Sequence, residues 1–217
     1  MGKVLRVSQD EPSDEVVLEA ASVLRAGGVV VMPTDSVYGI GCAMLEENPG
    51  RVCVFDIKRR DLSQTLPLLV ADHDDLPRYA RTVGRAAVVL AGEFWPGALT
   101  MVVPASDEVP PEYRAADGTV ALRMPDSNLV RELIRTVGVP LAVTSANTHG
   151  EAAATSGEGI EPRIVAEADL TLDAGPAPLA VASTIVSLVG AEPTILREGA
   201  IPGDQVYWAA RSSTFDE

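Results

Sequence analysis

The chain has 217 residues, 47% of them hydrophobic, and its 31 acidic and 17 basic side chains give a formal net charge of −14. This length fits one α/β domain, and the mean hydropathy of +0.16 excludes a disordered chain. The apolar stretches are too short for a membrane span, and the negative charge disfavours a broad grip on a nucleic-acid backbone.

Cysteine and histidine usage limits the metal chemistry and the compartment. Cys42 and Cys53 are the only cysteines, which suits a reducing cytosol better than a disulfide scaffold. Neither His73 nor His149 has ligand spacing to a cysteine, so we predict no protein-held metal. The first fifteen residues turn acidic and have no long apolar segment, so we expect no secretory signal and a cytoplasmic protein.

The first predicted helix covers residues 14–26, with Ser13 as its N-cap and acidic residues in its first turn. Residues 29–33 follow as an apolar strand, whose lack of polar alternation is typical of burial on both faces. Residues 33–41 then read PTDSVYGIG. We expect a hydroxyl-rich turn there, with glycines that let the backbone pass close to a small ligand.

The remaining elements alternate between helix and strand until a hairpin closes the series. In chain order the prediction gives a helix at 50–58, a strand at 67–70, a helix at 76–92, a turn at 94–97, a strand at 99–103 and a polar loop at 105–118. It continues with a strand at 119–123, a helix capped by Asp126 and closed by Gly138, a strand at 140–144, a mobile loop at 148–161, a short helix from Pro162, a strand at 169–173, hairpin strands at 183–189 and 193–197, and a helix after Pro202.

This order of elements predicts a single α/β domain with a mixed sheet flanked by helices. We expect the domain to cover residues 10–204 and a C-terminal tail to cover 205–217. No internal repeat or linker indicates a second domain.

Polar side chains stand at the ends of several apolar strands. They are Thr34, Lys58 with Arg60, Thr119 with Arg123, Ser145 with Asn147, Ser183, and Arg197. Because ligands of open α/β sheets bind where strands end, separate segments of this kind can converge on one cleft.

Each of these groups also has a purely local interpretation. Thr34 can be turn chemistry, and Ser145 with Asn147 can be a cap for loose backbone groups. Arg123 can form a surface salt bridge, and Lys58 can complement the C-terminal end of a helix dipole. Taken singly, the residues do not decide between these alternatives and a site.

Seven sequence segments, taken in their order along the chain, favour a functional site over the local interpretations. The chain resembles the family of threonylcarbamoyl-adenylate synthases, the YrdC-like or Sua5-like domain, in the segments PTDSVYGIG, K-x-R, WPGALT, TVALRMP, TSAN, STIV and ILREG. The resemblance covers residues 16–200 and implies a twisted α/β sheet around a cationic cavity, in a short form without the extra C-terminal domain of longer relatives. It implies the synthesis of threonylcarbamoyl-AMP and pyrophosphate from L-threonine, bicarbonate and ATP, with Mg²⁺, for the t6A modification of tRNA.

The resemblance also implies roles for nine residues. Lys58, Arg60, Ser145 and Asn147 would form the catalytic, nucleotide-handling set, Thr119 and Arg197 would also contact ATP, and Thr34, Arg123 and Ser183 would bind threonine. We expect a hydrophobic niche beside Thr34, formed with Tyr38, to admit the threonine methyl group. The planar fork of Arg123 suits a carboxylate, whereas Lys58 and Arg60 suit the charge that develops on the phosphates. The family pattern is altered at Thr148-His149-Gly150, which leaves ATP contacts in the 148–157 loop open.

The implied partners are the small substrates and the proteins that transfer the threonylcarbamoyl group to tRNA. Direct tRNA binding is expected to be weak or absent because the net charge is −14. Two alternatives stay open at this point: an RNA-binding module, and a nucleotide-binding paralogue without this synthase activity.

Overall fold

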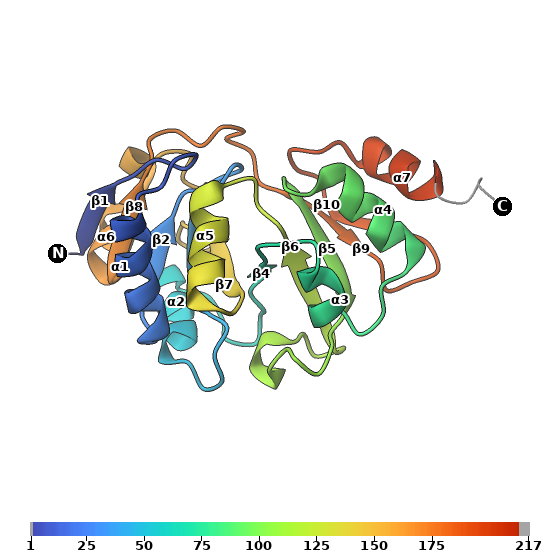
Figure 1. Ribbon diagram of the computed structural model, residues 1–217, viewed down its shortest axis with the longest axis horizontal. Helices are drawn as coiled ribbons and strands as arrows, with labels where there is room; N and C mark the ends of the chain where they lie inside the picture. The colour runs from blue at the N-terminus through green and yellow to red at the C-terminus, as the bar shows by residue number, and fades with distance from the viewer. Residues whose placement is uncertain (1, 213–217) are drawn as a thin grey trace.

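One twisted sheet of ten strands organises the computed structural model, which describes residues 2–212 (Figure 1). The strands are β1 (Lys3–Arg6), β2 (Val30–Met32), β3 (Gly39–Ala43), β4 (Leu68–Leu69), β5 (Leu99–Pro104), β6 (Thr119–Arg123), β7 (Leu141–Ser145), β8 (Leu170–Asp173), β9 (Thr184–Ser187) and β10 (Thr194–Arg197). Their order across the sheet is β1-β8-β2-β3-β7-β4-β6-β5-β9-β10. Residues 213–217 of the predicted tail lie outside the described residues.

Helices cover the sheet on its faces. They are α1 (Asp14–Arg25), α2 (Pro49–Lys58), α3 (Asp75–Tyr79), α4 (Arg85–Phe94), α5 (Asn128–Val137), α6 (Pro162–Glu167) and α7 (Gly203–Ser212), with short 3-10 turns at Pro111–Tyr113 and Gly157–Gly159. Figure 1 shows α1 beside α5 over one half of the sheet, and α4 with α7 over the other. None of the helices in the described range has the length and apolar character of a membrane span.

The sheet is mixed, as predicted. β2 pairs antiparallel with β3 and parallel with β8, while β4 pairs parallel with β6 and antiparallel with β7. The pair β9 and β10 is the expected antiparallel hairpin. The two-residue strand β4 is thus the hydrogen-bonded connection between the half that contains β3 and β7 and the half that contains β5 and β6.

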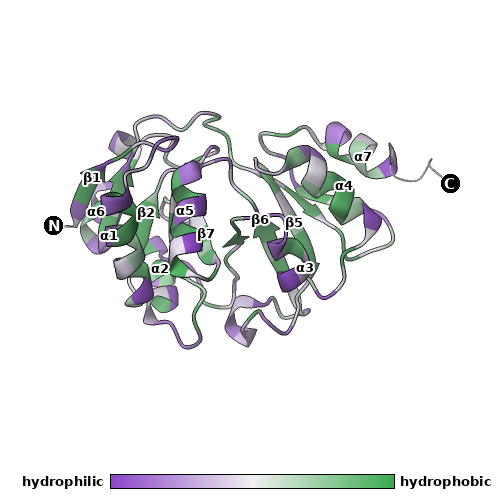
Figure 2. Cartoon of the chain, in the orientation of Figure 1, coloured by the Kyte–Doolittle hydropathy of each residue, from purple (hydrophilic) through white to green (hydrophobic). Residues whose placement is uncertain are grey.

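Successive side chains of β2 point to opposite faces of the sheet, and both faces are covered by a hydrophobic core. Val30 and Met32 enter the core beneath α1 and α5, whereas Val31 enters the core on the opposite face. All three residues of this strand are buried. Figure 2 shows hydrophobic strands inside the molecule and helices whose hydrophilic residues face outward.

The predicted cap of α1 is confirmed, and that of α5 is wrong by one residue. Ser13 Oγ accepts a hydrogen bond from Val16 N, whereas at α5 the acceptor is Ser127 Oγ, bonded by Val130 N at 3.4 Å. The backbone N–H of Asp126 donates instead to Asp35 Oδ1 at 3.2 Å. Gly138 ends α5 in the left-handed region, with φ 91°.

The segment read as a glycine-rich turn contains strand β3. Gly41 pairs with Val143 of β7, and a Cβ at Gly41 would lie 2.4 Å from the Ala142 carbonyl oxygen. Gly41 therefore permits close contact between two strands, whereas Gly39 of the same segment lines the cavity described below. The sequence analysis did not predict strand β1. This strand begins at Lys3, whose ammonium forms an ion pair with Glu19.

The helix predicted over residues 76–92 is two helices, α3 and α4. Between them Ala80 bridges to Ala105, and Arg81 N donates to the Pro104 carbonyl at 2.8 Å. These tertiary hydrogen bonds replace the helical ones, so the helix stops at Tyr79 and restarts after Gly84.

Gly41→Ala should lower the free energy of unfolding by about 1–3 kcal/mol, because the new methyl group overlaps the backbone of β7. The matched control is Gly92→Ala in the exposed interior of α4, where the added Cβ has no heavy atom within 4 Å apart from its chain neighbours and the adjacent helix backbone. That change should raise stability by about 0.5–1 kcal/mol, since alanine is the better helix former. Urea unfolding followed by circular dichroism measures both, and equal effects of the two changes would contradict the packing assigned to Gly41.

Candidate active site

A cavity of about 260 Å³ opens at the centre of the sheet, between its two halves. Segments distant in sequence form its wall: the loop between β2 and β3, the ends of β6 and β7, β5, and the start of β9. The residues that line it are Thr34, Ser36, Val37, Tyr38, Gly39, Pro67, Leu69, Thr100, Arg123, Val143, Thr144, Ser145, Asn147, Glu151, Ala153, Ala182, Ser183, Ile185 and Arg197. Seven of the ten predicted site residues are in this set.

Arg123 enters the cavity from the end of β6 and is held on three sides. Its Nε donates to the Gly97 carbonyl at 2.9 Å, one terminal nitrogen donates to Ser36 Oγ at 2.7 Å, and the other donates to Asp35 Oδ1 at 2.6 Å. The Arg123 and Asp35 side chains are each only 7% exposed. Burial lowers the pKa of Arg123, and the Asp35 carboxylate opposes this shift.

The hydroxyl of Thr34 belongs to the loop that supports Arg123. Thr34 Oγ1 donates to the Val37 carbonyl at 2.7 Å and lies 3.0 Å from Ser36 Oγ. Ser36 N donates back to Thr34 Oγ1. Turn chemistry and a place on the cavity wall therefore coexist at Thr34.

Arg197 brings a second guanidinium from the edge of the sheet. Its Nε and a terminal nitrogen donate to the Ser183 carbonyl at 3.1 and 2.7 Å. Ser183 Oγ lies 2.9 Å from Thr100 Oγ1, which fixes this corner of the wall. No acidic side chain within residues 2–212 forms an ion pair with Arg197. The residue is exposed, and partial desolvation of its guanidinium lowers its pKa.

Lys58 does not line the cavity but lies beneath one of its walls. Its ammonium donates to the Ser145 carbonyl at 2.5 Å, to the Asn147 carbonyl at 2.7 Å and to Asn147 Oδ1 at 3.4 Å. Lys58 is the last residue of α2 and only 2% exposed. Burial, with a smaller contribution from Arg60, lowers its pKa to about 8.

The amide of Asn147 is also engaged within the protein. Its Nδ2 donates to the carbonyls of Thr148 and Glu151, each at 2.8 Å. Lys58 and Asn147 together therefore fix the Ser145–Asn147 segment, on which Ser145 is half-buried and lines the cavity.

Arg60 and Thr119 lie outside the lining of the cavity. One of the terminal nitrogens of Arg60 nevertheless donates to Oγ1 of the lining residue Thr144 at 3.3 Å. Thr119 begins β6, at the opposite end of the strand from Arg123, and its hydroxyl donates to Asp117 Oδ1 at 2.7 Å. The cavity does not include it.

Tyr38 lines the cavity, but its hydroxyl bonds elsewhere. The hydroxyl donates to the Gly175 carbonyl at 2.6 Å, and burial raises its pKa to about 12. We conclude that this phenol anchors the segment that follows β8.

Sequence reasoning missed Asp35, Ser36, Thr100 and Glu151 as parts of the site. The first two lie inside the PTDSVYGIG segment, and Thr100 ends WPGALT, so a search of those motifs for polar groups beside Arg123 and Ser183 could have found them. Glu151 has no comparable signal, because it follows a glycine in a polar loop.

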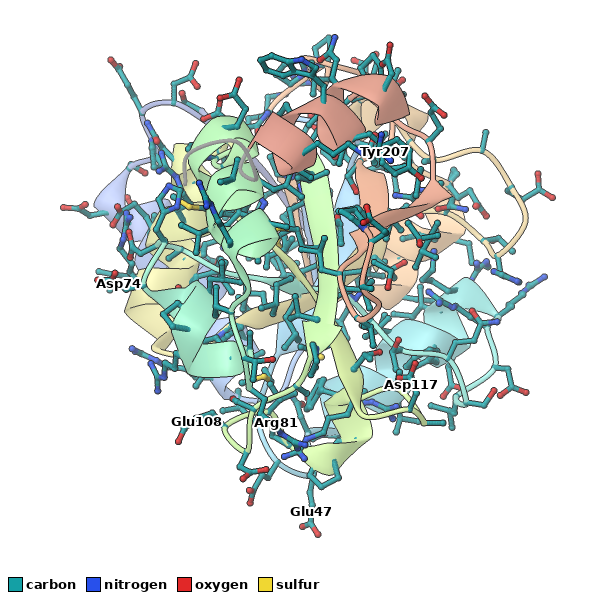
Figure 3. The ribbon with its side chains drawn as sticks, turned by 90° about the vertical axis from the view of Figure 1, so that its right-hand side faces the viewer. Glu47, Asp74, Arg81, Glu108, Asp117 and Tyr207 are labelled. Carbon is teal, nitrogen blue, oxygen red and sulfur yellow. The ribbon has the colours of Figure 1, made fainter. Side chains whose placement is uncertain are left out.

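The electrostatics of the cavity differ from those of the surface. Acidic residues such as Glu47, Asp74 and Glu108 lie at the periphery in Figure 3 and are exposed. The cavity wall contains two guanidinium groups, and Glu151 is its single carboxylate among the described residues. No group of three or more His, Cys, Asp or Glu within residues 2–212 is arranged to hold a metal ion.

Comparisons with known proteins agree with this architecture. The family model Sua5_yciO_yrdC, described as telomere recombination, matches residues 22–199. A threonylcarbamoyl-AMP synthase of Pyrococcus abyssi is 33% identical over 86% of this chain and 55% of its own length. Another, from Stenotrophomonas maltophilia, is 36% identical over 73% of this chain and 87% of its own length.

A solved structure of P. abyssi Sua5 complexed with L-threonine has a TM-score of 0.89 at 30% identity. It covers 95% of this chain and 60% of the other. The present chain thus spans little more than half the length of its P. abyssi relative.

The buried ammonium of Lys58 should make stability depend on pH. Lys58 keeps its proton up to about 10.5 in the unfolded chain but releases it near pH 8 in the fold. The unfolded state therefore binds more protons between these values, and the free energy of unfolding contributed by Lys58 rises with pH across that window. Below pH 8 both states hold the proton, so stability no longer changes with pH on account of Lys58 and the cost of burying its ammonium is at its full value.

Urea unfolding of the wild type and of Lys58→Met at pH 7.5, 9 and 10 tests this pH dependence. The wild type should gain stability relative to the variant as the pH rises. Parallel pH profiles of the two proteins would contradict the lowered pKa.

Proposed function

The chain belongs to the Sua5/YciO/YrdC family, and from this membership we propose that it is an L-threonylcarbamoyladenylate synthase. The reaction joins L-threonine, bicarbonate and ATP and releases pyrophosphate. The observation that carries the proposal is the convergence of Thr34, Arg123, Ser145, Ser183 and Arg197 on one cavity, from five separate segments of the chain.

The chemistry requires a site that gathers anions. Bicarbonate, the threonine carboxylate and the ATP phosphates are all negative, and an acidic protein repels them unless cations are concentrated locally. Arg123 and Arg197 supply this concentration: both line the cavity, and backbone carbonyl groups hold their guanidinium groups in place.

The reaction proceeds in two bond-forming steps. The threonine amine attacks the carbon of bicarbonate, and loss of water leaves a carbamate. A carbamate oxygen then attacks the α-phosphorus of ATP, while the bond to the bridging oxygen of the β-phosphate breaks and its electrons leave with pyrophosphate. No covalent intermediate with the protein is needed.

The residues of the cavity divide between the two substrates. We assign the threonine carboxylate to Arg123 and the threonine side chain to the wall formed by Thr34, Tyr38 and Ser183. The phosphates face Arg197 and the segment containing Ser145, where fixed donors stabilise the charge that develops at the α-phosphorus.

Lys58 and Asn147 contribute in this proposal by holding the phosphate-facing segment in place. The three acceptors around the Lys58 ammonium come from Ser145 and Asn147, so their geometry depends on this buried charge. Arg60 adds positive charge behind Thr144.

Mg²⁺ enters with the nucleotide in this proposal. The described part of the chain has no cluster of metal ligands, and Mg²⁺ commonly binds through substrate phosphates while it keeps several waters. The donor set of the cavity therefore fits MgATP as a substrate, and Glu151 is the lining carboxylate that can meet its hydration shell.

The product is an activated adenylate, so its threonylcarbamoyl group must pass to a tRNA-modifying protein. We propose that this protein acts in the cytoplasm and that downstream threonylcarbamoyl-transfer proteins are its partners. Direct contact with tRNA is weak or absent in this proposal, because the net charge is −14.

The activity itself can be measured with labelled bicarbonate, L-threonine and MgATP. The protein should release pyrophosphate and form a labelled adenylate only when all three are present. Nucleotide binding without threonine-dependent pyrophosphate would reject the synthase in favour of a nucleotide-binding paralogue.

Arg197→Gln should lower kcat/KM by about 100-fold, because the substitution removes a fixed cation from the phosphate side of the cavity. The matched control is Arg135→Gln on α5, where the guanidinium is exposed and pairs with Asp72 and Glu132. The control should retain full activity. Equal activities of the two variants would remove Arg197 from the proposed site.

A further inference from the structure

Asp35 is a buried acid that none of the assigned roles uses. It is 5% exposed, lies in the loop after β2, and does not line the cavity. Its Oδ1 accepts hydrogen bonds from Arg123 at 2.6 Å and from Asp126 N at 3.2 Å. Its other oxygen, Oδ2, is shielded from solvent and has no hydrogen-bond partner within residues 2–212.

A buried carboxylate with one unsatisfied oxygen is costly to maintain. A neutral side chain of similar shape would avoid this cost, so packing alone does not explain an acid at residue 35. The cost is offset where the charge faces a buried cation, and Arg123 is that cation.

The Asp35 contact also determines which donors of Arg123 stay available. A guanidinium has five N–H groups, and Gly97, Ser36 and Asp35 accept one each. One N–H remains on each terminal nitrogen. Two such donors form the pattern that a carboxylate accepts with its two oxygens.

We propose that Asp35 is a positioning residue for the substrate carboxylate: it fixes the guanidinium of Arg123 so that the two remaining N–H groups face the cavity. The proposal rests on the proposed function, since it takes the carboxylate of threonine as the group bound there. Asp35 does not touch the substrate and acts through Arg123.

An alternative role for Asp35 predicts the opposite change in carboxylate binding when the acid is neutralised. If the acid served only to reduce the positive charge of the cavity, its neutralisation would strengthen carboxylate binding. If it fixes the donors, neutralisation frees the guanidinium to rotate and weakens carboxylate binding. The direction of the change therefore separates the two roles.

The variant Asp35→Asn keeps the shape and one carbonyl oxygen but removes the charge. Ser36→Ala removes the neutral acceptor at the other terminal nitrogen of Arg123 and leaves Asp35 in place. The control is Asp72→Asn, which also breaks a contact between an arginine and an aspartate, at 2.5 Å, but on the exposed face of α5.

Steady-state kinetics with each substrate varied should show a selective defect. We expect Asp35→Asn to raise the KM for threonine at least tenfold while the KM for MgATP changes less than twofold, and Ser36→Ala to raise the threonine KM about threefold. Asp72→Asn should match the wild type. A lower threonine KM in Asp35→Asn, or parallel changes in both KM values, would overturn the proposal.

A measurement without substrate separates this inference from the proposed function. In nitrogen-15 spectra of arginine side chains, the terminal N–H groups of Arg123, one of which donates to Asp35, should exchange slowly with water in the wild type and fast in Asp35→Asn. Loss of protection supports the positioning role even if the wild type makes no adenylate, whereas unchanged protection overturns it. If Asp35→Asn does not fold, the same spectrum of Ser36→Ala decides, with weaker protection expected and wild-type protection as the contrary result.

Discussion

The buried ion pair between Arg123 and Asp35 is the contact on which the geometry of the cavity depends. Arg123 ends β6 in one half of the sheet, and Asp35 follows β2 in the other half. Between the two halves, the sheet itself is connected only through the two residues of β4, so far as residues 2–212 show. A directed, charged contact across this narrow connection links the two walls of the cavity.

Neutral oxygens, rather than carboxylates, hold most of the cations in the candidate site. Carbonyl groups of Ser145 and Asn147 surround the Lys58 ammonium, and the Ser183 carbonyl holds Arg197. Neutral acceptors orient a cation without cancelling its charge, so that charge stays available to an anion. Arg123 is the exception, and its carboxylate partner is the feature that singles out Asp35.

Much of this arrangement could be predicted from strand ends and motif order. The mixed sheet, the cap at Ser13 and the hairpin before Arg197 follow from local patterns, and the strand-end rule brought Arg123 and Ser183 to one place. Local patterns could not show that Ala80 leaves its helix to pair with Ala105, because that bond is tertiary. Nor could they show that Lys58 points beneath the cavity wall.

A crystal structure with L-threonine and a non-hydrolysable ATP analogue shows which side chain binds the substrate carboxylate. We expect the threonine carboxylate on the two remaining donors of Arg123, with the contact to Asp35 intact, and the phosphates beside Arg197 and Ser145. A carboxylate bound away from Arg123, or a guanidinium that leaves Asp35 to reach it, would rule out the role of the Arg123–Asp35 ion pair proposed above.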